Sequence, residues 1–303
     1  MLENPQVTRR GEGQAGMTAD VIAYQGEPGA NSHIACNDVY PDWQTLPCAT
    51  FEDALGAVAD GRARLGMIPI ENSIAGRVAD IHHLLPGSSL YIIGEYFLPI
   101  HFQLLGLRGA ELAKVRSVHS HVHALGQCRK IIRAHGLAAH VSGDTAGAAR
   151  EVAESADPSR AAIATMLAAQ IHGLDVLAAD IEDEPHNTTR FVVLSKTPAW
   201  AKPESGRAVT SFVFRVRNVP AALYKALGGF ATNGVNMTKL ESYMVEGEFT
   251  ATQFLADVEA HPEEPALGRA LDELAFFCKE LKILGVYRAH SFRHECRTRA
   301  LED

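Results

Sequence analysis

The segment 187–194, NTTRFVVL, combines side chains that could bind an anion. Thr188, Thr189 and Arg190 stand directly before an apolar run. A guanidinium beside hydroxyl groups can donate several hydrogen bonds to one carboxylate. The same residue types also occur in ordinary edge strands, where threonine is favoured for its β propensity. The segment therefore predicts a strand that either binds a carboxylate or lies at a surface edge.

Two further segments place polar residues after a predicted strand. Glu71, Asn72 and Ser73 follow the apolar run LGMIPI, and GEPGANSH follows VIAYQ. In open α/β sheets, ligands bind at the carboxyl ends of strands. The glycine turn at residues 26–29 could also present backbone amides to an anion. In both segments the alternative is a plain turn whose Asn or Ser side chain caps the following helix.

Three histidines alternate along the segment VHSHVHALGQC, at His119, His121 and His123. On a strand they would share one face and could bind a metal ion. Helical periodicity begins near His121, however, and no acidic residue lies within the segment, so we expect no metal site. Ser120 and His121 at a strand-to-helix turn are better suited to hydrogen bonding with an anionic ligand.

The composition is that of an ordinary globular protein of 303 residues, with 47% apolar and 21% charged residues. The net charge of −8 and the lack of a basic run argue against a nucleic-acid partner. No apolar run approaches the roughly 18 residues of a membrane helix, so we expect no membrane segment. The five cysteines are widely spaced, which predicts neither a disulfide framework nor a zinc site and favours a cytoplasmic location.

The elements that must position these residues alternate between short β-branched runs and helical periodicity over residues 21–195. This pattern predicts an α/β fold with a mostly parallel sheet. The segment 91–107 is too long for one ordinary strand and is interrupted by Pro99. We therefore expect the chain to cross there between two lobes, with a cleft between them.

Residues 208–287 differ in character from the preceding part of the chain. Strand and helix patterns follow one another there in the order β-α-β-β-α-β, which is typical of a ferredoxin-like fold. The expected divisions are a disordered extension at residues 1–18, the two-lobed domain at 19–196, a linker at 197–207, the ferredoxin-like domain at 208–287 and a tail at 288–303.

The motifs GEPGANSH, PIENSIAGRV, SHVHALGQC, DTAGAA and NTTRFVVL stand in this order and together resemble prephenate dehydratase. The resemblance covers about residues 20–287, and its most specific parts are PIENS and the triplet of Thr189, Arg190 and Phe191. It implies a two-lobed catalytic domain like that of periplasmic binding proteins, followed by a ferredoxin-like ACT domain. It also implies decarboxylative dehydration of prephenate to phenylpyruvate, carbon dioxide and water in L-phenylalanine biosynthesis, with no cofactor and no metal.

The resemblance further implies roles for individual residues. Thr189 matches the threonine that the family treats as essential, and its hydroxyl would polarise the leaving oxygen. Arg190 would anchor a carboxylate of the substrate, or would be a structural partner at the cleft wall. Relatives have proline and glutamine at the positions of Val122 and His123, so no role is carried over to His123. The matches to substrate-binding positions are Asn72, Ser73, Ser120, His121, Gln127, Thr145 and Phe191.

The second domain resembles ACT domains that respond to phenylalanine. The common forms have glycine where Ala221 stands and arginine-proline where Tyr243 and Met244 stand. The resemblance implies feedback regulation by L-phenylalanine, bound between the ACT domains of a homodimer or homotetramer. The positions that match the two effector motifs are Ala221, Ala222, Leu223, Glu241 and Ser242.

Two other functions stay open. Arogenate dehydratase performs the same elimination on the amino analogue of prephenate, and no residue of the chain distinguishes the two substrates. A two-lobed protein with an ACT domain could also be a ligand sensor without catalysis, although a sensor has no evident need for Thr189. No segment resembles chorismate mutase, so we expect a monofunctional enzyme.

Overall fold

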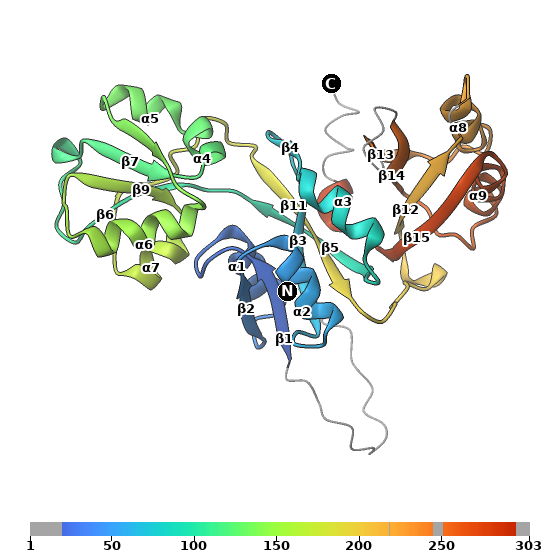
Figure 1. The fold of residues 1–303 in the computed structure, drawn as a ribbon, viewed down its shortest axis with the longest axis horizontal. Helices are drawn as coiled ribbons and strands as arrows, with labels where there is room; N and C mark the ends of the chain where they lie inside the picture. Colours follow the sequence, from blue (N-terminus) through green and yellow to red (C-terminus); the bar gives the residue numbers. More distant parts are fainter. Residues whose placement is uncertain (1–19, 218, 245–250, 295–303) are drawn as a thin grey trace, which may run out of the picture.

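The computed structural model describes residues 20–217, 219–244 and 251–294. Their chain forms two α/β lobes and a third, antiparallel domain, arranged in a row (Figure 1). The expected extension at residues 1–18 and the end of the tail, 295–303, lie outside the described residues.

The first lobe is a mixed sheet with helices packed on it (Figure 1). Helix α2 begins at an N-cap, Thr50, whose side chain accepts a hydrogen bond from the amide of Asp53, and the helix buries Leu55 and Val58. The sheet order is β2 (Gln44–Cys48), β1 (Val21–Gln25), β3 (Leu65–Asn72), β11 (Thr188–Ser195) and β5 (Tyr91–Pro99), with β4 (Gly76–Arg77) paired to β3. The helices are α1 (Asn31–Val39), α2 (Phe51–Ala59) and α3 (Ala79–Gly87).

The second lobe has the same kind of architecture. Its helix α6 has Asp144 as its N-cap, whose carboxylate accepts from the amide of Gly147, and α7 has Thr165 as its N-cap, whose hydroxyl accepts from the amide of Ala168. The sheet order is β10 (Asp175–Ala178), β6 (Gln103–Gly106), β9 (Arg160–Ala164), β7 (Ser117–Ser120) and β8 (Ala138–Val141). The helices are η1 (Leu112–Lys114), α4 (Val122–Gln127), α5 (Arg129–Ala134), α6 (Thr145–Ser155) and α7 (Met166–His172).

The chain crosses between the lobes twice, as the length of the segment 91–107 predicts. It passes from β5 to β6 after Pro99 and returns from β10 to β11. Because the two crossings run in opposite directions, β11 pairs antiparallel with both β3 and β5, and β6 pairs antiparallel with β9. The expectation of a mostly parallel sheet is therefore met only by the strands that do not belong to the crossings, such as β1, β2 and β7.

The third domain has the expected β-α-β-β-α-β order, and its sheet order, β13-β14-β12-β15, is that of a ferredoxin-like fold. Helix α9 ends at Phe277, where the chain enters a long final strand at Cys278. The elements are β12 (Ala208–Val216), α8 (Ala222–Thr232), β13 (Met237–Met244), β14 (Ala251–Val258), α9 (Pro265–Phe277) and β15 (Cys278–Arg288), after the short helix η2 (Pro203–Ser205).

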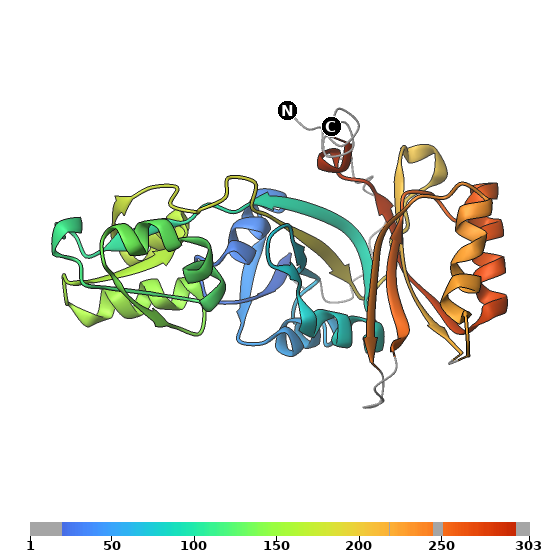
Figure 2. The same ribbon diagram turned by 90° about the horizontal axis from the view of Figure 1, so that it is seen from above.

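The third sheet carries α8 and α9 on its outer face and presents its other face to the first lobe (Figure 2). One hydrophobic cluster is shared by the two domains, with Ile70 and Ile92 of the first lobe packed with Val213 and Leu284 of the third domain. Gly285 permits strand β15 of the third domain to pack closely against β5, since a Cβ atom at position 285 would collide with the carbonyl oxygen of Ile92. The expected fold class, two α/β lobes followed by a ferredoxin-like domain, is confirmed.

Candidate active site

Thr189 and Asn72 lie directly opposite each other on the neighbouring strands β11 and β3. The amide Nδ2 of Asn72 donates to Thr189 Oγ1 over 2.9 Å. Asn72 Oδ1 accepts from the backbone amides of Ile74 and Ala75, at 3.0 and 2.8 Å, so the amide group cannot flip without losing both bonds. Thr189 Oγ1 is therefore an acceptor toward Asn72, which leaves its hydroxyl proton to be donated elsewhere. Asn72 closes a turn and does not cap a helix.

Asn187 extends this contact to the second lobe. Its Oδ1 atom accepts from Asn72 Nδ2 over 2.7 Å, and its Nδ2 atom donates to Gln127 Oε1 over 2.7 Å. Gln127 is the last residue of helix α4, so the bond joins the two lobes next to a chain crossing. We call Thr189, Asn72, Asn187 and Gln127 the amide array. Asn187 was not among the predicted site residues, although it begins the NTTRFVVL segment.

Ser73 fixes the loop that precedes the array. Its hydroxyl donates to the carbonyl oxygen of His186 over 2.9 Å and accepts from the amide of Thr188 over 2.9 Å. The Ser73 amide in turn donates to the carbonyl oxygen of Thr188 over 2.9 Å. Ser73 is exposed, so it still presents a polar surface beside Thr189.

The remaining predicted residues of the second lobe differ in accessibility. His121 is the N-cap of α4, with Nδ1 accepting from the amide of His123, and burial followed by the charge of His123 lowers its pKa. Thr145 is half-buried at the first position of α6. Ser120 is fully buried, and its hydroxyl donates to the carbonyl oxygen of Ile163 over 2.6 Å, so it holds two strands of its own sheet together.

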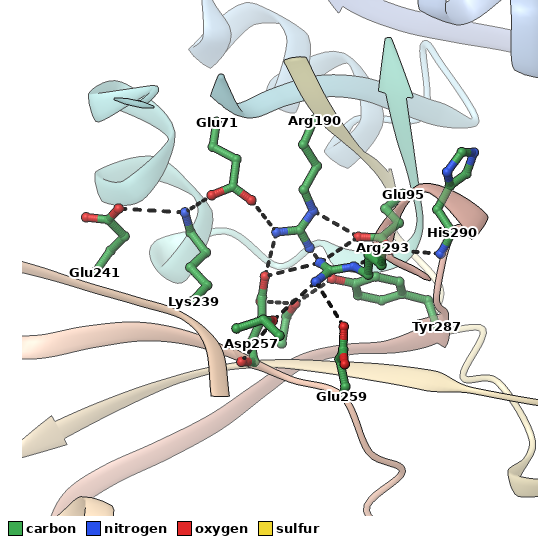
Figure 3. Close-up of polar contacts among 12 residues, drawn as sticks. Glu71, Glu95, Arg190, Lys239, Glu241, Asp257, Glu259, Tyr287, His290 and Arg293 are labelled. Atoms are coloured by element: carbon green, nitrogen blue, oxygen red, sulfur yellow. Dashed lines mark hydrogen bonds and ion pairs between the residues drawn. The ribbon is translucent and has the colours of Figure 1, made fainter. Parts of the chain in front are cut away.

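Arg190 points away from Thr189, because successive strand residues face opposite sides of a sheet. Its side chain is 3% exposed. The guanidinium donates to Glu95 Oε2 at 2.9 Å, to Glu71 Oε1 at 2.7 Å and to Asp257 of the third domain (Figure 3). Of the two roles that the sequence leaves open for Arg190, the geometry favours the structural partner. Phe191 is 1% exposed and belongs to the hydrophobic core.

Three carboxylates form ion pairs with Arg190. Burial alone would lower the pKa of its guanidinium, but the charges of Asp257, Glu95 and Glu71 hold that pKa well above its usual value. Burial likewise would raise the pKa of Asp257, and Arg190 and Arg293 lower it instead. Arg190 and Asp257 are therefore ionised and paired at neutral pH.

The predicted effector residues lie on two elements of the third domain. Ala221 precedes helix α8 in the left-handed region, with a φ of 60°, which explains physically why a glycine is common at this position. Glu241 and Ser242 lie on the edge strand β13, where Arg77 Nη1 approaches Glu241 Oε2 at 3.7 Å and donates to the carbonyl oxygen of Ser242 at 3.0 Å. Ala222 and Leu223, which begin α8, are half-buried.

The alternating histidines do not gather in one cluster, although the rings of His121 and His123 stay in contact. His119 stacks on His140 with ring centroids 4.8 Å apart, whereas His121 packs edge-on against His123. Within the described ranges, the potential metal ligands that come within 4.8 Å of one another are His101, Asp180 and Glu182. Glu182 already accepts from His101 and from the amide of Phe102, so this group holds the two chain crossings together.

A profile of the family "Prephenate dehydratase" matches residues 22–199, which include every member of the amide array. The chain belongs to the prephenate dehydratase family. Prephenate dehydratases are carbon-oxygen lyases, so the expected enzyme class is confirmed. In the part of the chain that the structure describes, no helix has the length and apolar character needed to cross a membrane.

Three relatives show how far the similarity extends. A bifunctional N-acyl-homoserine lactone acylase/prephenate dehydratase of Komagataeibacter europaeus is 54% identical over 275 residues, 91% of this chain and 98% of that protein. The chloroplastic arogenate dehydratase/prephenate dehydratase 2 of Arabidopsis thaliana is 35% identical over 88% of this chain and 72% of its own. The crystal structure of prephenate dehydratase from Arthrobacter aurescens in complex with L-Phe is 32% identical, with a TM-score of 0.82, and covers 89% of this chain and 90% of its own.

Proposed function

We propose that this protein converts prephenate to phenylpyruvate, carbon dioxide and water, and that the reaction takes place at the amide array. The observation that carries the proposal is the hydrogen bond from Asn72 to Thr189, which leaves the threonine hydroxyl proton free to be donated to a group other than Asn72. In a member of the prephenate dehydratase family, that proton has a clear use, because the substrate must lose a hydroxyl group.

The chemistry requires little beyond orientation and one hydrogen bond. The bond between the ring and its carboxylate breaks, its electron pair moves into the ring, and the carbon-oxygen bond on the opposite side breaks. Prephenate dianion and one proton thus become phenylpyruvate anion, carbon dioxide and water. Thr189 donates a hydrogen bond to the departing oxygen and stabilises its developing negative charge. Because a threonine hydroxyl is a weak acid, water supplies the proton that completes the product water.

The substrate carboxylates must be bound by groups other than Arg190, which is fully paired on the far face of β11. The predicted site residues whose polar side chains are at least partly accessible are Ser73, His121, Gln127 and Thr145, and we propose that these orient the substrate. The burial of Ser120 and Phe191 favours a supporting role for both. Four buried free cysteines among the described residues support the proposed cytoplasmic location.

Steady-state kinetics of Thr189→Ala, with phenylpyruvate detected by its absorbance in alkali, tests the catalytic proposal. The variant should fold normally and lose about 10² to 10³-fold in kcat, with a smaller change in KM. Thr189→Ser should recover part of the loss, and Thr188→Ala, one residue away, is the matched control. Turnover of Thr189→Ala at the wild-type rate would exclude the proposed role.

We further propose that L-phenylalanine regulates the enzyme from a site that includes Ala221, Ala222, Leu223, Glu241 and Ser242, between the ACT domains of a homodimer or homotetramer. The L-Phe complex of the Arthrobacter relative supports the choice of effector. The double variant Glu241→Ala, Ser242→Ala should lose the phenylalanine response and retain turnover. An unchanged inhibition curve would refute the site.

Two other substrates follow from the named relatives. Arogenate is the alternative for the same elimination, and kcat/KM for arogenate and prephenate, measured side by side, separates the two. Hydrolysis of N-acyl-homoserine lactones is a second candidate activity, because the Komagataeibacter relative that carries this name is 54% identical along nearly its whole length. Release of fatty acid from an acyl-homoserine lactone, followed by chromatography, tests that activity. Among these readings, membership of an enzyme family does not favour a sensor without catalysis.

A further inference from the structure

Strands β3 and β11 carry two adjacent residue pairs that face opposite sides of the sheet. Thr189 lies opposite Asn72, and Arg190 lies opposite Glu71. The first pair belongs to the amide array, whereas the second pair contacts the third domain. A displacement of the second pair must move the first, because each pair is joined to the other by peptide bonds on both strands.

An ion-pair cluster connects the second pair to the strand that holds the proposed effector residues (Figure 3). Lys239 of β13 donates through Nζ to Glu71 Oε2 over 2.5 Å, and the same Nζ lies 3.8 Å from Glu241 Oε1. Glu71 Oε1 in turn accepts from Arg190. An unbroken line of charged contacts therefore runs from Glu241 to the residue that follows Thr189.

The cluster has little freedom to absorb a movement. Its central members are the cations Arg190, Lys239 and Arg293 and the carboxylates Glu71, Glu95 and Asp257, three of each sign. The side chains of Lys239 and Arg190 are 4% and 3% exposed. Glu71, which joins these two cations, is 32% exposed. Because water cannot replace a lost partner of the two buried cations, a shift of either cation must draw its carboxylate partners with it.

Ser211 and Tyr287 stiffen the side of the cluster that belongs to the third domain. The Ser211 hydroxyl donates to Asp257 and is bonded to the Tyr287 hydroxyl, and Tyr287 OH accepts from Arg190 Nη2 over 2.8 Å. On the other side, Arg293 holds Glu95 with two hydrogen bonds of 2.7 and 2.9 Å. Residues 288–294 of the expected tail thus contribute to the junction between the domains.

We propose that Lys239 and Arg190 are positioning residues, which transmit a displacement of strand β13 to the hydrogen bond between Asn72 and Thr189. The proposal rests on the proposed function, since it names the physical route by which phenylalanine would change turnover. An effector that engages Glu241 alters the partners of Lys239, and Lys239 moves Glu71. The pair of Asn72 and Thr189 then separates, and the hydroxyl of Thr189 loses its orientation.

The first test compares two lysine variants at the same junction between domains. Lys239→Gln removes the link between Glu241 and Glu71. Lys282→Gln is the matched control, because Lys282 also crosses to the first lobe but donates, among the described residues, to the backbone carbonyl oxygens of Pro86 and Ser88 and to no carboxylate. Phenylalanine inhibition of prephenate turnover and direct phenylalanine binding by calorimetry are measured for both variants.

In Lys239→Gln we expect phenylalanine to bind with a Kd within about threefold of wild type, while the inhibition at saturation falls at least about tenfold. Lys282→Gln should respond as wild type does. Full inhibition of Lys239→Gln would overturn the proposal, and so would an equal loss of response in both variants. Loss of phenylalanine binding in Lys239→Gln would also overturn it, because Lys239 would then belong to the effector site itself.

The second test does not depend on phenylalanine. Arg190→Gln should lower kcat by about 10 to 100-fold and change KM by less than about threefold, because Arg190 orients Thr189 and does not touch the substrate. Arg190→Lys should recover part of kcat. A rise in KM with unchanged kcat would overturn the positioning role. If Arg190→Gln fails to fold, the comparison of Lys239→Gln with Lys282→Gln decides whether the proposal holds.

The outcomes also separate this proposal from the proposed function. Wild-type protein that is folded and does not convert prephenate would refute the function itself. Wild-type protein that converts prephenate but ignores phenylalanine would overturn the route from β13. Wild-type inhibition that persists in Lys239→Gln would refute the route alone and leave the proposed function intact.

Discussion

The substitution Asn72→Asp tests the orientation of the catalytic hydroxyl with the smallest possible change of shape. In the wild type, Asn72 donates to Thr189 Oγ1, and its Oδ1 is held by two backbone amides. A carboxylate can keep those two acceptor bonds but cannot donate. Thr189 must then turn its proton toward the introduced carboxylate, so the donor that the departing oxygen requires is lost.

The expected loss has two parts. Removal of one preorganised donor costs about 10² to 10³-fold in kcat, or about 2.7–4 kcal/mol. The added negative charge repels the substrate carboxylates, and at a separation of about 6 Å with an effective dielectric constant of 20–80 this costs roughly 0.7–2.8 kcal/mol. The second part should raise KM between about threefold and a hundredfold. Asn72→Ala adds no charge and leaves the hydroxyl free to donate, so its kcat should fall only about tenfold.

Initial rates of phenylpyruvate formation over a range of prephenate concentrations separate kcat from KM. Asn236→Asp, at an exposed position just before β13, is a control for the same chemical change. The double variant of Asn72→Asp with Thr189→Ala should lose no more kcat than the worse single variant, because both changes remove the same hydrogen bond. A kcat for Asn72→Asp within about threefold of wild type would refute the orientation argument.

Four further outcomes are expected. Asp257→Asn removes one of the negative charges paired with the buried Arg190 and should lower the free energy of unfolding in urea by about 3–5 kcal/mol. The control Asp272→Asn, on the exposed face of α9, should change that free energy by less than about 0.5 kcal/mol. A loss below about 1 kcal/mol for Asp257→Asn would contradict the ion-pair assignment. Burial would raise the pKa of both Glu71 and Asp257, but Arg190 and the neighbouring cations lower it, so each folded pKa lies below the unfolded value near 4. Their contribution is therefore complete above about pH 4 and is lost as the pH falls through the folded values, and the acid limb of the stability curve should flatten in Asp257→Asn. Ala221→Gly removes the strain of a left-handed backbone at φ 60° and should stabilise the protein by about 1 kcal/mol, which a higher Tm would show. A lower Tm would show that the left-handed conformation of Ala221 carries no strain. Dialysis against EDTA should leave kcat within about twofold of its starting value, and restoration of lost activity by a divalent cation would reveal a metal requirement.

The amino-acid sequence identifies most of the candidate site from residue type and local position. Asn72 and Thr189 stand next to apolar runs that predict strands, and Gln127 lies in a segment with helical periodicity. The spacing of apolar residues also predicts the order of elements in the third domain. Strands and helices repeat their apolar residues with different periods, and each element there is long enough for its period to be recognised.

Contacts between distant parts of the chain are decided by the tertiary structure. Asn187 contacts Asn72 across 115 positions and Gln127 across 60, and no local pattern encodes such a pairing. The direction of Ser120 is likewise set by its neighbour β9 in the sheet, whose Ile163 accepts its hydrogen bond.

Arg190 shows most clearly what the sequence determines and what only the tertiary structure determines. The sequence alone determines that a guanidinium follows the threonine hydroxyl, and both chemical types suit a carboxylate ligand. Side chains alternate between the two faces of the sheet along β11, which places Thr189 and Arg190 on opposite faces. The third domain then supplies Asp257, 67 positions away in the sequence, as a partner of Arg190. A buried guanidinium needs its counter-charges within hydrogen-bonding distance, and only the packing of the third domain against the first lobe determines which carboxylates those are.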